Sequence, residues 1–300
     1  LAAKHFGTDH REYYVTPDDL VAHIPTVAAH YDQPFGNSSA LPAYLCQLRA
    51  RADGVTRLLA GDGGDELFGG NSRYAMQRVF GWYQQVPGVA RRGLLEPLLQ
   101  GSALGRAPLL RKAARYITQS KIPLPDRLLT YNLLQRLGPE RILTPEFLAG
   151  IDTEDPARQQ REVWDAAGGD RTSEINRMLG FDWRYTLAEN DLPKVCGTAA
   201  LAGMDVAFPL LDDDLLDFSS RLPTSYKLRG LTLRWFFKEA LRGFLPDEIL
   251  RKPKHGFGLP FGVWLTQHPP LQRLALDSVS GLADRGIVRA SFVDELVRKL

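Results

Sequence analysis

Apolar residues near the start of the chain recur at the spacing of a helix. Leu20, Ile24 and Val27 fall on one face. Residues 16–19, Thr-Pro-Asp-Asp, supply a helix start: a capping hydroxyl, a proline at the first helical position and acids against the positive end of the helix dipole. A second helix is predicted from about 39 to 52, where an Asp-Gly pair ends it.

Two short runs in the same region have the composition of strands. Residues 11–15 form a β-rich run, and the apolar run 55–60 leads into a glycine-rich loop. A strand, a crossover through helices and a second strand imply a parallel sheet. We therefore predict an α/β fold with a partial parallel sheet over residues 1–75.

Strand signals vanish after about residue 78, and leucine and arginine continue at helical spacing. Residues 144–146 open a helix with Thr-Pro-Glu. Residues 233–244 carry an apolar stripe that predicts one continuous helix, with Arg234 on its solvated face. We predict that residues 76–300 are helical and fold back over the sheet, so that 1–300 form a single incomplete domain.

Charge and composition exclude several classes of partner. The chain has 300 residues, with 37 basic and 35 acidic side chains and a net charge of +2. This balance gives no reason to expect nucleic acid or an anionic membrane as partner. No apolar stretch approaches the length of a bilayer span. Cys46 and Cys196 show no metal-binding spacing, so we expect two small buried residues in a reducing, cytoplasmic protein.

The run from Leu58 to Gly70 carries the strongest candidate chemistry. Its glycines let the backbone turn sharply and approach a ligand closely; they are Gly61, Gly63 and Gly64. Its acids stand at the carboxyl end of a predicted strand, where open α/β sheets bind their ligands; they are Asp62, Asp65 and Glu66. Peptide N–H groups for phosphates and hard oxygens for a metal suit a magnesium-bound nucleotide. An acidic surface turn is the simpler alternative.

A second segment, residues 251–264, is rich in basic residues and glycine. Lys254 lies in a loop pinned by Pro253 and Gly256, which makes it a positionable point charge for phosphate. From composition alone, a solvated basic turn is the favoured interpretation of this segment.

Together the two segments resemble the synthetase domain of the glutamine-dependent asparagine synthetase family. The resemblance continues through residues 182–194, 205–212 and 222–223, in the order of the family. It covers most of the chain and is weak in the middle. No single piece is decisive, but the ordered set is specific. It implies an ATP-pyrophosphatase-type nucleotide-binding domain.

The resemblance implies an ATP-dependent, amide-forming ligase. The family activates a carboxylate, that of aspartate, with ATP and Mg²⁺ and then transfers ammonia released from glutamine to the acyl-adenylate. Asp65 matches the family's metal-binding aspartate, and Ala60 and Gly61 match positions along the nucleotide, which Gly63 and Gly64 continue. Asp62 matches a residue that helps to form or consume the acyl-adenylate. Its alternative role is to tie down the turn through peptide N–H groups.

Two further catalytic candidates follow from the resemblance. Lys254 matches a lysine that the family uses during adenylation. Asp205 matches a family glutamate that could orient the substrate or accept a proton.

The chain departs from the family around the acceptor carboxylate. A family glutamate is shortened to Asp205, a family arginine is replaced by Ala207, and Cys196-Gly197 stands where the family has Asp-Arg. These changes weaken the argument for aspartate as the substrate more than the argument for ATP or Mg²⁺ as cofactors. The alternatives are an amidotransferase or cyclising synthetase acting on another carboxylate, and a non-catalytic, degenerate nucleotide-binding scaffold.

Two parts of the family pattern do not occur in the sequence. The pyrophosphate loop, Ser-Gly-Gly-x-Asp-Ser, and the amino-terminal glutaminase domain are missing. We therefore expect a fragment that is inactive alone and that works with a glutaminase domain in a longer protein. A homodimer is compatible with the sequence.

Overall fold

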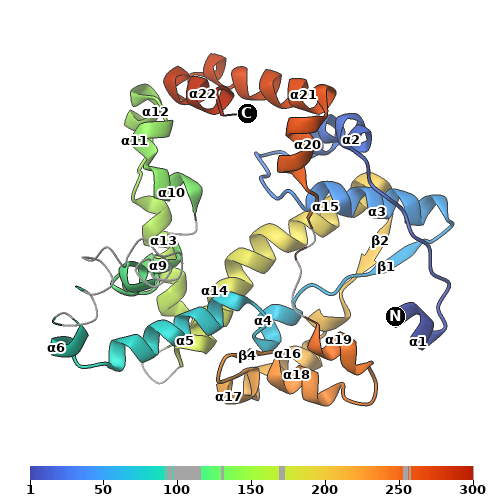
Figure 1. Ribbon diagram of the computed structural model, residues 1–300, viewed down its shortest axis with the longest axis vertical. Coiled ribbons are helices and arrows are strands. Elements are labelled where there is room, and N and C mark those ends of the chain that lie inside the picture. Colours follow the sequence, from blue (N-terminus) through green and yellow to red (C-terminus); the bar gives the residue numbers. More distant parts are fainter. Residues whose placement is uncertain are drawn as a thin grey trace.

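The computed structural model describes residues 1–91, 93, 97, 116–129, 132–168, 173–252, 256 and 258–299. Figure 1 shows a largely helical chain with a small parallel sheet of β1 and β2 to one side, near α3 and α15. The helices of the first half are α1 (Ala2–Phe6), α2 (Pro17–His30), α3 (Ala40–Ala52), α4 (Gly64–Phe68), α5 (Ser72–Gln85), α6 (Gly88–Ala90), α9 (Asp126–Leu129), α10 (Leu133–Leu137), α11 (Pro139–Ile142) and α12 (Pro145–Ala149).

The second half contributes most of the remaining elements. They are α13 (Asp155–Ala166), α14 (Glu174–Asp182), the π-helix η3 (Trp183–Asp191), α15 (Leu192–Ala202), the 3₁₀ turns η4 (Pro209–Leu211) and η5 (Ala283–Arg285), α16 (Asp213–Arg221), α17 (Thr224–Lys227), α18 (Trp235–Ala240), α19 (Asp247–Arg251), α20 (Phe261–Gln267), α21 (Pro269–Ser280) and α22 (Ala290–Val297).

The start of α2 confirms the predicted capping signal. The side-chain oxygen of Thr16 accepts a hydrogen bond from the N–H of Asp19, and the Asp19 carboxylate accepts one from the N–H of Thr16. This capping box satisfies two donors that would otherwise have no partner. The predicted helices at 39–52 and at 144–146 are also confirmed, as α3 and α12.

The parallel sheet pairs strands other than the predicted ones. Strand β1 spans Arg57–Leu59, shorter than the predicted 55–60, and it pairs in parallel with β2 (Asp205–Ala207), in a region expected to be helical. Residues 11–15 adopt no strand. An isolated extended segment has no ladder to satisfy its backbone groups, so strand-forming side chains alone do not make a strand.

The predicted helix over 233–244 is also wrong in its bounds. Leu233 belongs to β4 (Thr232–Leu233), which pairs with β3 (Leu228–Arg229) as an antiparallel ribbon. Arg234 then has a left-handed backbone, and α18 begins only at Trp235. Phe244, counted in the apolar stripe, lies beyond this helix and is 60% exposed.

Helices α14, η3 and α15 follow one another without a break from residue 174 to 202, as Figure 1 shows. The two ends of this rod belong to different cores. The first core packs α15 against α2, α3 and α21 and includes Leu20, Leu41, Tyr44, Ala199, Ala202 and Leu271. The second packs α14 against α5, α9 and α13 and includes Tyr74, Leu128, Trp164, Met178, Phe181 and Leu228.

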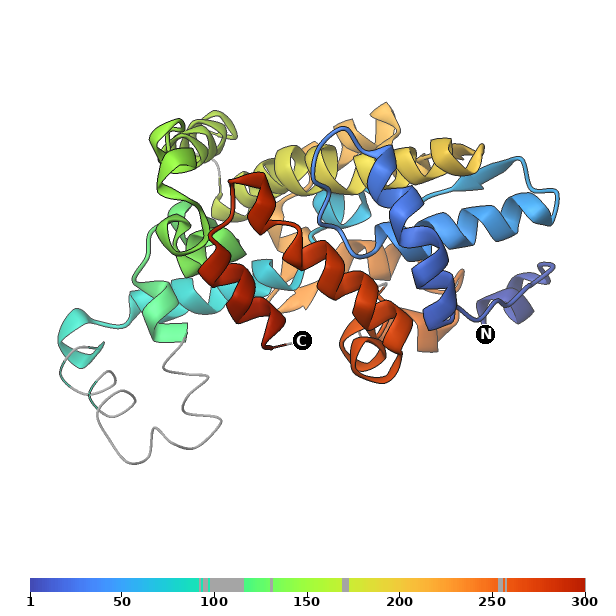
Figure 2. The ribbon, with the colours of Figure 1, turned by 90° about the horizontal axis from the view of Figure 1, so that it is seen from above.

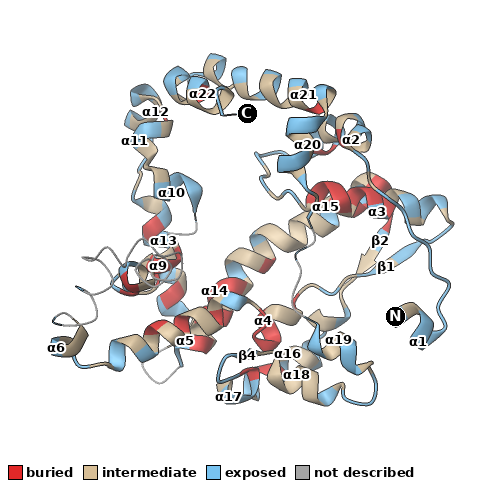
Figure 3. Ribbon diagram, viewed as in Figure 1, coloured by how far each residue is buried: buried red, intermediate tan, exposed pale blue. Residues whose placement is uncertain are grey.

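Figure 3 shows the buried positions gathered on α3 and α15 and again on α4, α5 and α14. Seen from above in Figure 2, α21 lies beside α2. There His268 accepts the N–H of Leu271 at the start of α21, and its Nε2 lies 2.9 Å from a carboxylate oxygen of Asp18. Among the described helices, none is long and apolar enough to cross a membrane.

Candidate active site

The glycine-rich loop directly follows β1. The N–H of Ala60 donates to the carbonyl of Ala207 at 2.9 Å and so extends the parallel ladder to the start of the loop. Gly63 has φ +91°, and a Cβ on it would lie 2.1 Å from Cδ2 of Leu211. Both the backbone conformation and the packing therefore require glycine there. The loop is fixed at the carboxyl end of β1, as predicted, and α4 begins at Gly64.

Asp62 points toward the long helix. Its Oδ1 lies 3.9 Å from Nζ of Lys194, which is also 2.9 Å from Oδ1 of Asp191. All three side chains are less than one-third exposed. Burial raises the pKa of Asp62, and the positive charge of Lys194 opposes the shift. The sequence reasoning missed Lys194 as a site residue, although the lysine stands in a segment that carried the family resemblance.

Asp65 lies on the other side of the loop, against the β3–β4 ribbon. Its Oδ1 is 3.5 Å from Nη1 of Arg234. The close contact requires glycine at position 70, because a Cβ there would come within 1.8 Å of the same carboxylate oxygen. Loop and ribbon thus hold this carboxylate between them.

Glu66 is the most deeply buried of the three loop acids, with 7% of its surface exposed. Burial raises its pKa to about 7, and the negative charges of Asp65, Asp182 and Asp191 add to the shift. The residue stands in the first turn of α4.

A buried acid that the sequence did not single out lies behind the loop. Asp182 is 1% exposed; it accepts hydrogen bonds from the Tyr74 hydroxyl at 2.5 Å and from Thr186 at 3.3 Å, and Arg73 Nη1 lies 3.0 Å away. Burial raises the pKa of Asp182, while Arg73 lowers it. Because its partners come from α5 and η3, Asp182 ties the helix after the loop to the long rod.

The structure does not bring Asp205 to this loop. In the parallel register Asp205 stands opposite Arg57, at the amino end of the sheet, and the two side chains form an ion pair at 3.6 Å. The Asp205 side chain is 73% exposed. Ala207, two residues on, is the β2 position nearest the loop.

Lys254 lies outside the described residues, as do Pro253 and His255. Arg251, the last residue of α19, forms an ion pair with Asp247 one turn earlier. The part in adenylation that the resemblance implies for Lys254 therefore stays a prediction.

The position of the missing family arginine is filled by another side chain. A Cβ on Gly197 would lie 2.9 Å from Cε1 of Tyr31, whose ring stacks on Phe35 at 4.3 Å between centroids. An arginine at 197 would have to displace this tyrosine. The expectation that Cys196 and Cys46 are buried is wrong, since both are exposed.

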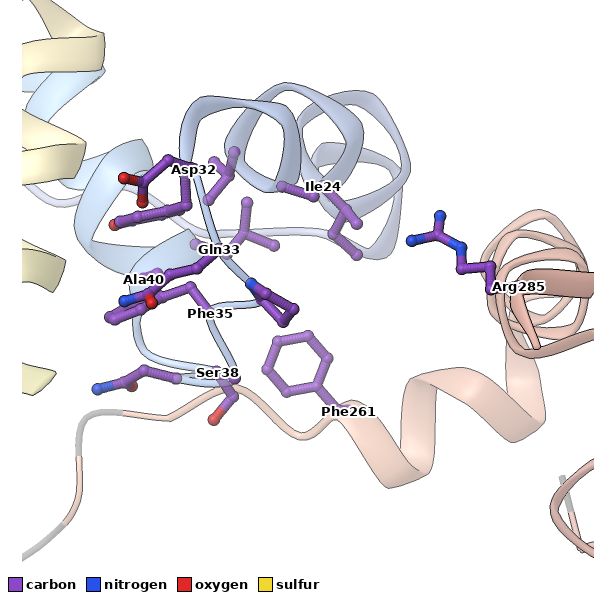
Figure 4. Close-up of a pocket in the computed structure, with 15 residues that line it drawn as sticks. Ile24, Asp32, Gln33, Phe35, Ser38, Ala40, Phe261 and Arg285 are labelled. Carbon is purple, nitrogen blue, oxygen red and sulfur yellow. The ribbon is translucent and has the colours of Figure 1, made fainter. Parts of the chain in front are cut away.

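A cavity of about 600 Å³ is lined by the segment 31–38, which includes Tyr31 and Phe35. Figure 4 shows Phe35 and Phe261 on its walls and the Arg285 side chain extending toward it from the opposite side. Asn37, which also lines the cavity, donates a hydrogen bond to Asn190 at 3.2 Å. This hydrogen bond connects the wall of the cavity to the π-helix η3.

Mg²⁺ suits the donors that the loop presents. Among the described residues, no group of three or more His, Cys, Asp or Glu forms a dedicated metal cage. Mg²⁺ in nucleotide sites commonly takes one or two carboxylates and completes its shell with phosphates and water. The carboxylate of Asp65, held against Gly70, fits that requirement.

The chain is thus an α/β protein with a glycine-rich loop and buried carboxylates at the carboxyl end of a parallel strand, the place where open α/β sheets bind their ligands. The sequence model of the Asparagine synthase family matches residues 1–300. The chain belongs to this family.

Curated relatives agree with this assignment. Asparagine synthetase 1 (glutamine-hydrolysing) of Bacillus subtilis strain 168 is 23% identical over 259 residues, 86% of this chain and 39% of that protein. A Mycobacterium bovis protein named as a candidate glutamine-hydrolysing asparagine synthetase is 25% identical over 270 residues, 88% of this chain and 39% of its own length. The chain thus spans well under half of these relatives.

Proposed function

We propose that the protein containing this chain is an ATP-dependent amide-forming ligase. It activates a carboxylate as an acyl-adenylate and transfers ammonia from glutamine to it, and asparagine formation from aspartate is the leading reaction. Family membership supports the ligase class. The observation that carries the proposal is the loop 61–66, which the structure fixes at the carboxyl end of β1 with Asp62 and Asp65 on its two sides.

Backbone and side chains of this segment have separate proposed parts. The backbone of Ala60, Gly61, Gly63 and Gly64 lies along the nucleotide, because glycine lets peptide N–H groups approach phosphate closely. Asp65 is the Mg²⁺ ligand. Bound Mg²⁺ would neutralise charge on the phosphates and so ease attack at the α-phosphorus.

Asp62 and Lys194 face the reacting carboxylate in this proposal. The half-buried ion pair supplies one acceptor and one cation at the same place, so it orients the acceptor and offsets charge that builds during adenylation. Lys254 remains the proposed second cation for the polyphosphate. Asp205 receives no part in the chemistry, because its carboxylate is paired with Arg57 at the far end of the strand.

A second candidate function has a specific observation in its favour. At the two family arginine positions the chain has Gly197, covered by Tyr31, and Ala207. A bidentate arginine is the usual partner of a substrate α-carboxylate, and these positions supply none. The cavity beside Phe35 offers room for an acceptor larger than aspartate. An acceptor carboxylate other than aspartate is therefore the alternative within the same ligase chemistry.

Asp65→Asn tests the proposed site in the full-length protein. We expect substrate-dependent ATP–pyrophosphate exchange to fall at least a hundredfold, because an amide oxygen is a weak Mg²⁺ ligand, while glutamine hydrolysis is retained. The matched control is Asp213→Asn on the exposed start of α16, which should leave exchange unchanged. Undiminished exchange in Asp65→Asn would remove this residue from the metal site.

A further inference from the structure

Arg234 has a backbone conformation that L-residues rarely adopt. Its φ of 52° and ψ of 37° are left-handed, and among the described residues it is the one non-glycine with positive φ. Such a conformation is unfavourable for an L-residue and persists where surrounding contacts enforce it. Here the N–H of Arg234 donates to the carbonyl of Gly69 at 3.2 Å, and its carbonyl accepts from Lys238 at 2.9 Å.

These backbone contacts aim the side chain at the glycine-rich loop. A Cβ on Gly70 would come within 2.9 Å of Cδ of Arg234 and within 1.8 Å of the Asp65 carboxylate. Glycine at position 70 therefore lets the guanidinium reach the carboxylate. The strained backbone after β4 and the absence of a side chain at Gly70 together allow the guanidinium of Arg234 to approach the carboxylate of Asp65.

The guanidinium is only loosely satisfied by Asp65. Their closest approach is 3.5 Å, longer than a charge-assisted hydrogen bond of about 2.7–2.9 Å. The Nε of Arg234 is buried and has no hydrogen-bond partner in the described part of the chain. A guanidinium has five N–H donors, so Arg234 retains donors for a second anion.

Four other cations of the described residues are paired with acids. Lys194 is 2.9 Å from Asp191, and Arg73 is 3.0 Å from Asp182. Arg184 and Arg221, which could have compensated for the arginines missing at 197 and 207, are paired with Glu189 and Asp217. Of these arginines, Arg234 is the one that reaches an acid of the glycine-rich loop.

We propose that Arg234 is an anion-binding residue of this site that alternates between Asp65 and phosphate. Without metal it neutralises Asp65. When Asp65 takes a divalent cation, the guanidinium turns its remaining N–H donors to the phosphate oxygens that share the cation. This inference rests on the proposed function, because it takes Asp65 as the metal ligand and a polyphosphate as the ligand.

The exchange of partners predicts opposite effects on two ligands. Removing the guanidinium removes a competitor of Mg²⁺, so Mg²⁺ alone should bind about two- to fivefold more tightly, as expected for a long ion pair whose side chains are about one-third exposed. Pyrophosphate should bind at least about tenfold more weakly, because a charge-assisted hydrogen bond is lost. A purely structural arginine would weaken both or neither.

The test uses the full-length protein with Arg234→Gln, Arg234→Gly and Arg229→Gln. Glycine adopts a φ of 52° without strain, so Arg234→Gly should fold even if the glutamine variant does not. Arg229 is the matched control, because its guanidinium stacks on Trp235 at 4.6 Å rather than facing the loop. Mg²⁺ and pyrophosphate affinities are measured by calorimetry, and folding by circular dichroism.

Tighter Mg²⁺ binding and weaker pyrophosphate binding in each Arg234 variant that folds, with neither change in Arg229→Gln, would establish the proposal. Wild-type affinities in the Arg234 variants, or weakening of both ligands, would overturn it. Asp65→Asn in the same assays separates the two levels. If that variant keeps wild-type Mg²⁺ affinity, the proposed metal site itself fails, whereas failure of Arg234 alone leaves the proposed function intact.

Discussion

At the scale of single residues, the loop 61–66 places three carboxylates in three different environments. Asp62 faces a lysine, Asp65 faces an arginine, and Glu66 is buried without an ion-pair partner among the described residues. Residue type and spacing in the sequence identified all three as candidates. Their environments could not be foreseen, because Lys194 and Arg234 lie more than a hundred positions further along the chain.

Glu66 makes stability depend on pH in a predictable direction. Its pKa is raised from 4.5 to about 7 in the folded state. A raised pKa contributes stability that is present below the unfolded value and is lost as pH rises through the folded value. We expect Glu66→Gln to be more stable than the wild type at pH 8, by up to about 3 kcal/mol, and the difference to disappear near pH 4.5.

Urea unfolding of the full-length protein at pH 4.5, 6 and 8, in EDTA, measures this difference. Glu248→Gln on α19 is the control, because Glu248 is exposed. A gain in stability that does not change between pH 4.5 and 8 would show that packing, and not ionisation, distinguishes glutamine from glutamate at position 66.

At the scale of elements, local signals predicted local structure. Helices α2, α3 and α12 begin or end where capping residues and glycine indicated. The strands were predicted less well: β2 lies about 145 positions from β1, so its pairing is a property of the folded chain. The apolar stripe over 233–244 predicted a helix that begins too early, because β4 and the left-handed Arg234 precede α18. Side-chain periodicity carries no signal for either feature.

Thr16→Ala measures how much the best of these local signals contributes. The Thr16 hydroxyl accepts from the N–H of Asp19 and donates to the Asp19 carboxylate. Losing both bonds should lower the free energy of unfolding by about 1–2 kcal/mol. Thr8→Ala in the preceding loop is the control. Equal unfolding midpoints in urea for the two variants would mean that tertiary contacts, rather than the cap, fix the start of α2.

At the scale of the whole molecule, two cores flank the candidate site. The first, around α3 and α15, holds the Asp62–Lys194 side, and the second, around α5 and α14, holds Asp182 behind the loop. The cavity beside Phe35 opens next to the first core. Tyr31, which lines this cavity, covers Gly197, one of the two positions where the family has an arginine.

An acceptor assay separates the leading function from its alternative. With ATP, glutamine and full-length protein, the alternative acceptor predicts a kcat/KM for aspartate at least tenfold below that for the best of a panel of larger carboxylates, because no arginine at 197 or 207 holds an α-carboxylate. Amide products are quantified by mass spectrometry. Efficient asparagine formation that no other carboxylate matches would restore aspartate as the substrate.

The π-helical segment Trp183–Asp191 sets the rotational phase between the two halves of the rod. Each residue added to or removed from a helix rotates the later part of that helix by about 100°. A one-residue change in η3 would therefore swing Lys194 away from Asp62 and, with it, the face of α15 that packs on α3. The geometry of the site and the registry of the two cores are set by the same nine residues. We therefore expect this protein to tolerate one-residue insertions or deletions in its loops but not within η3.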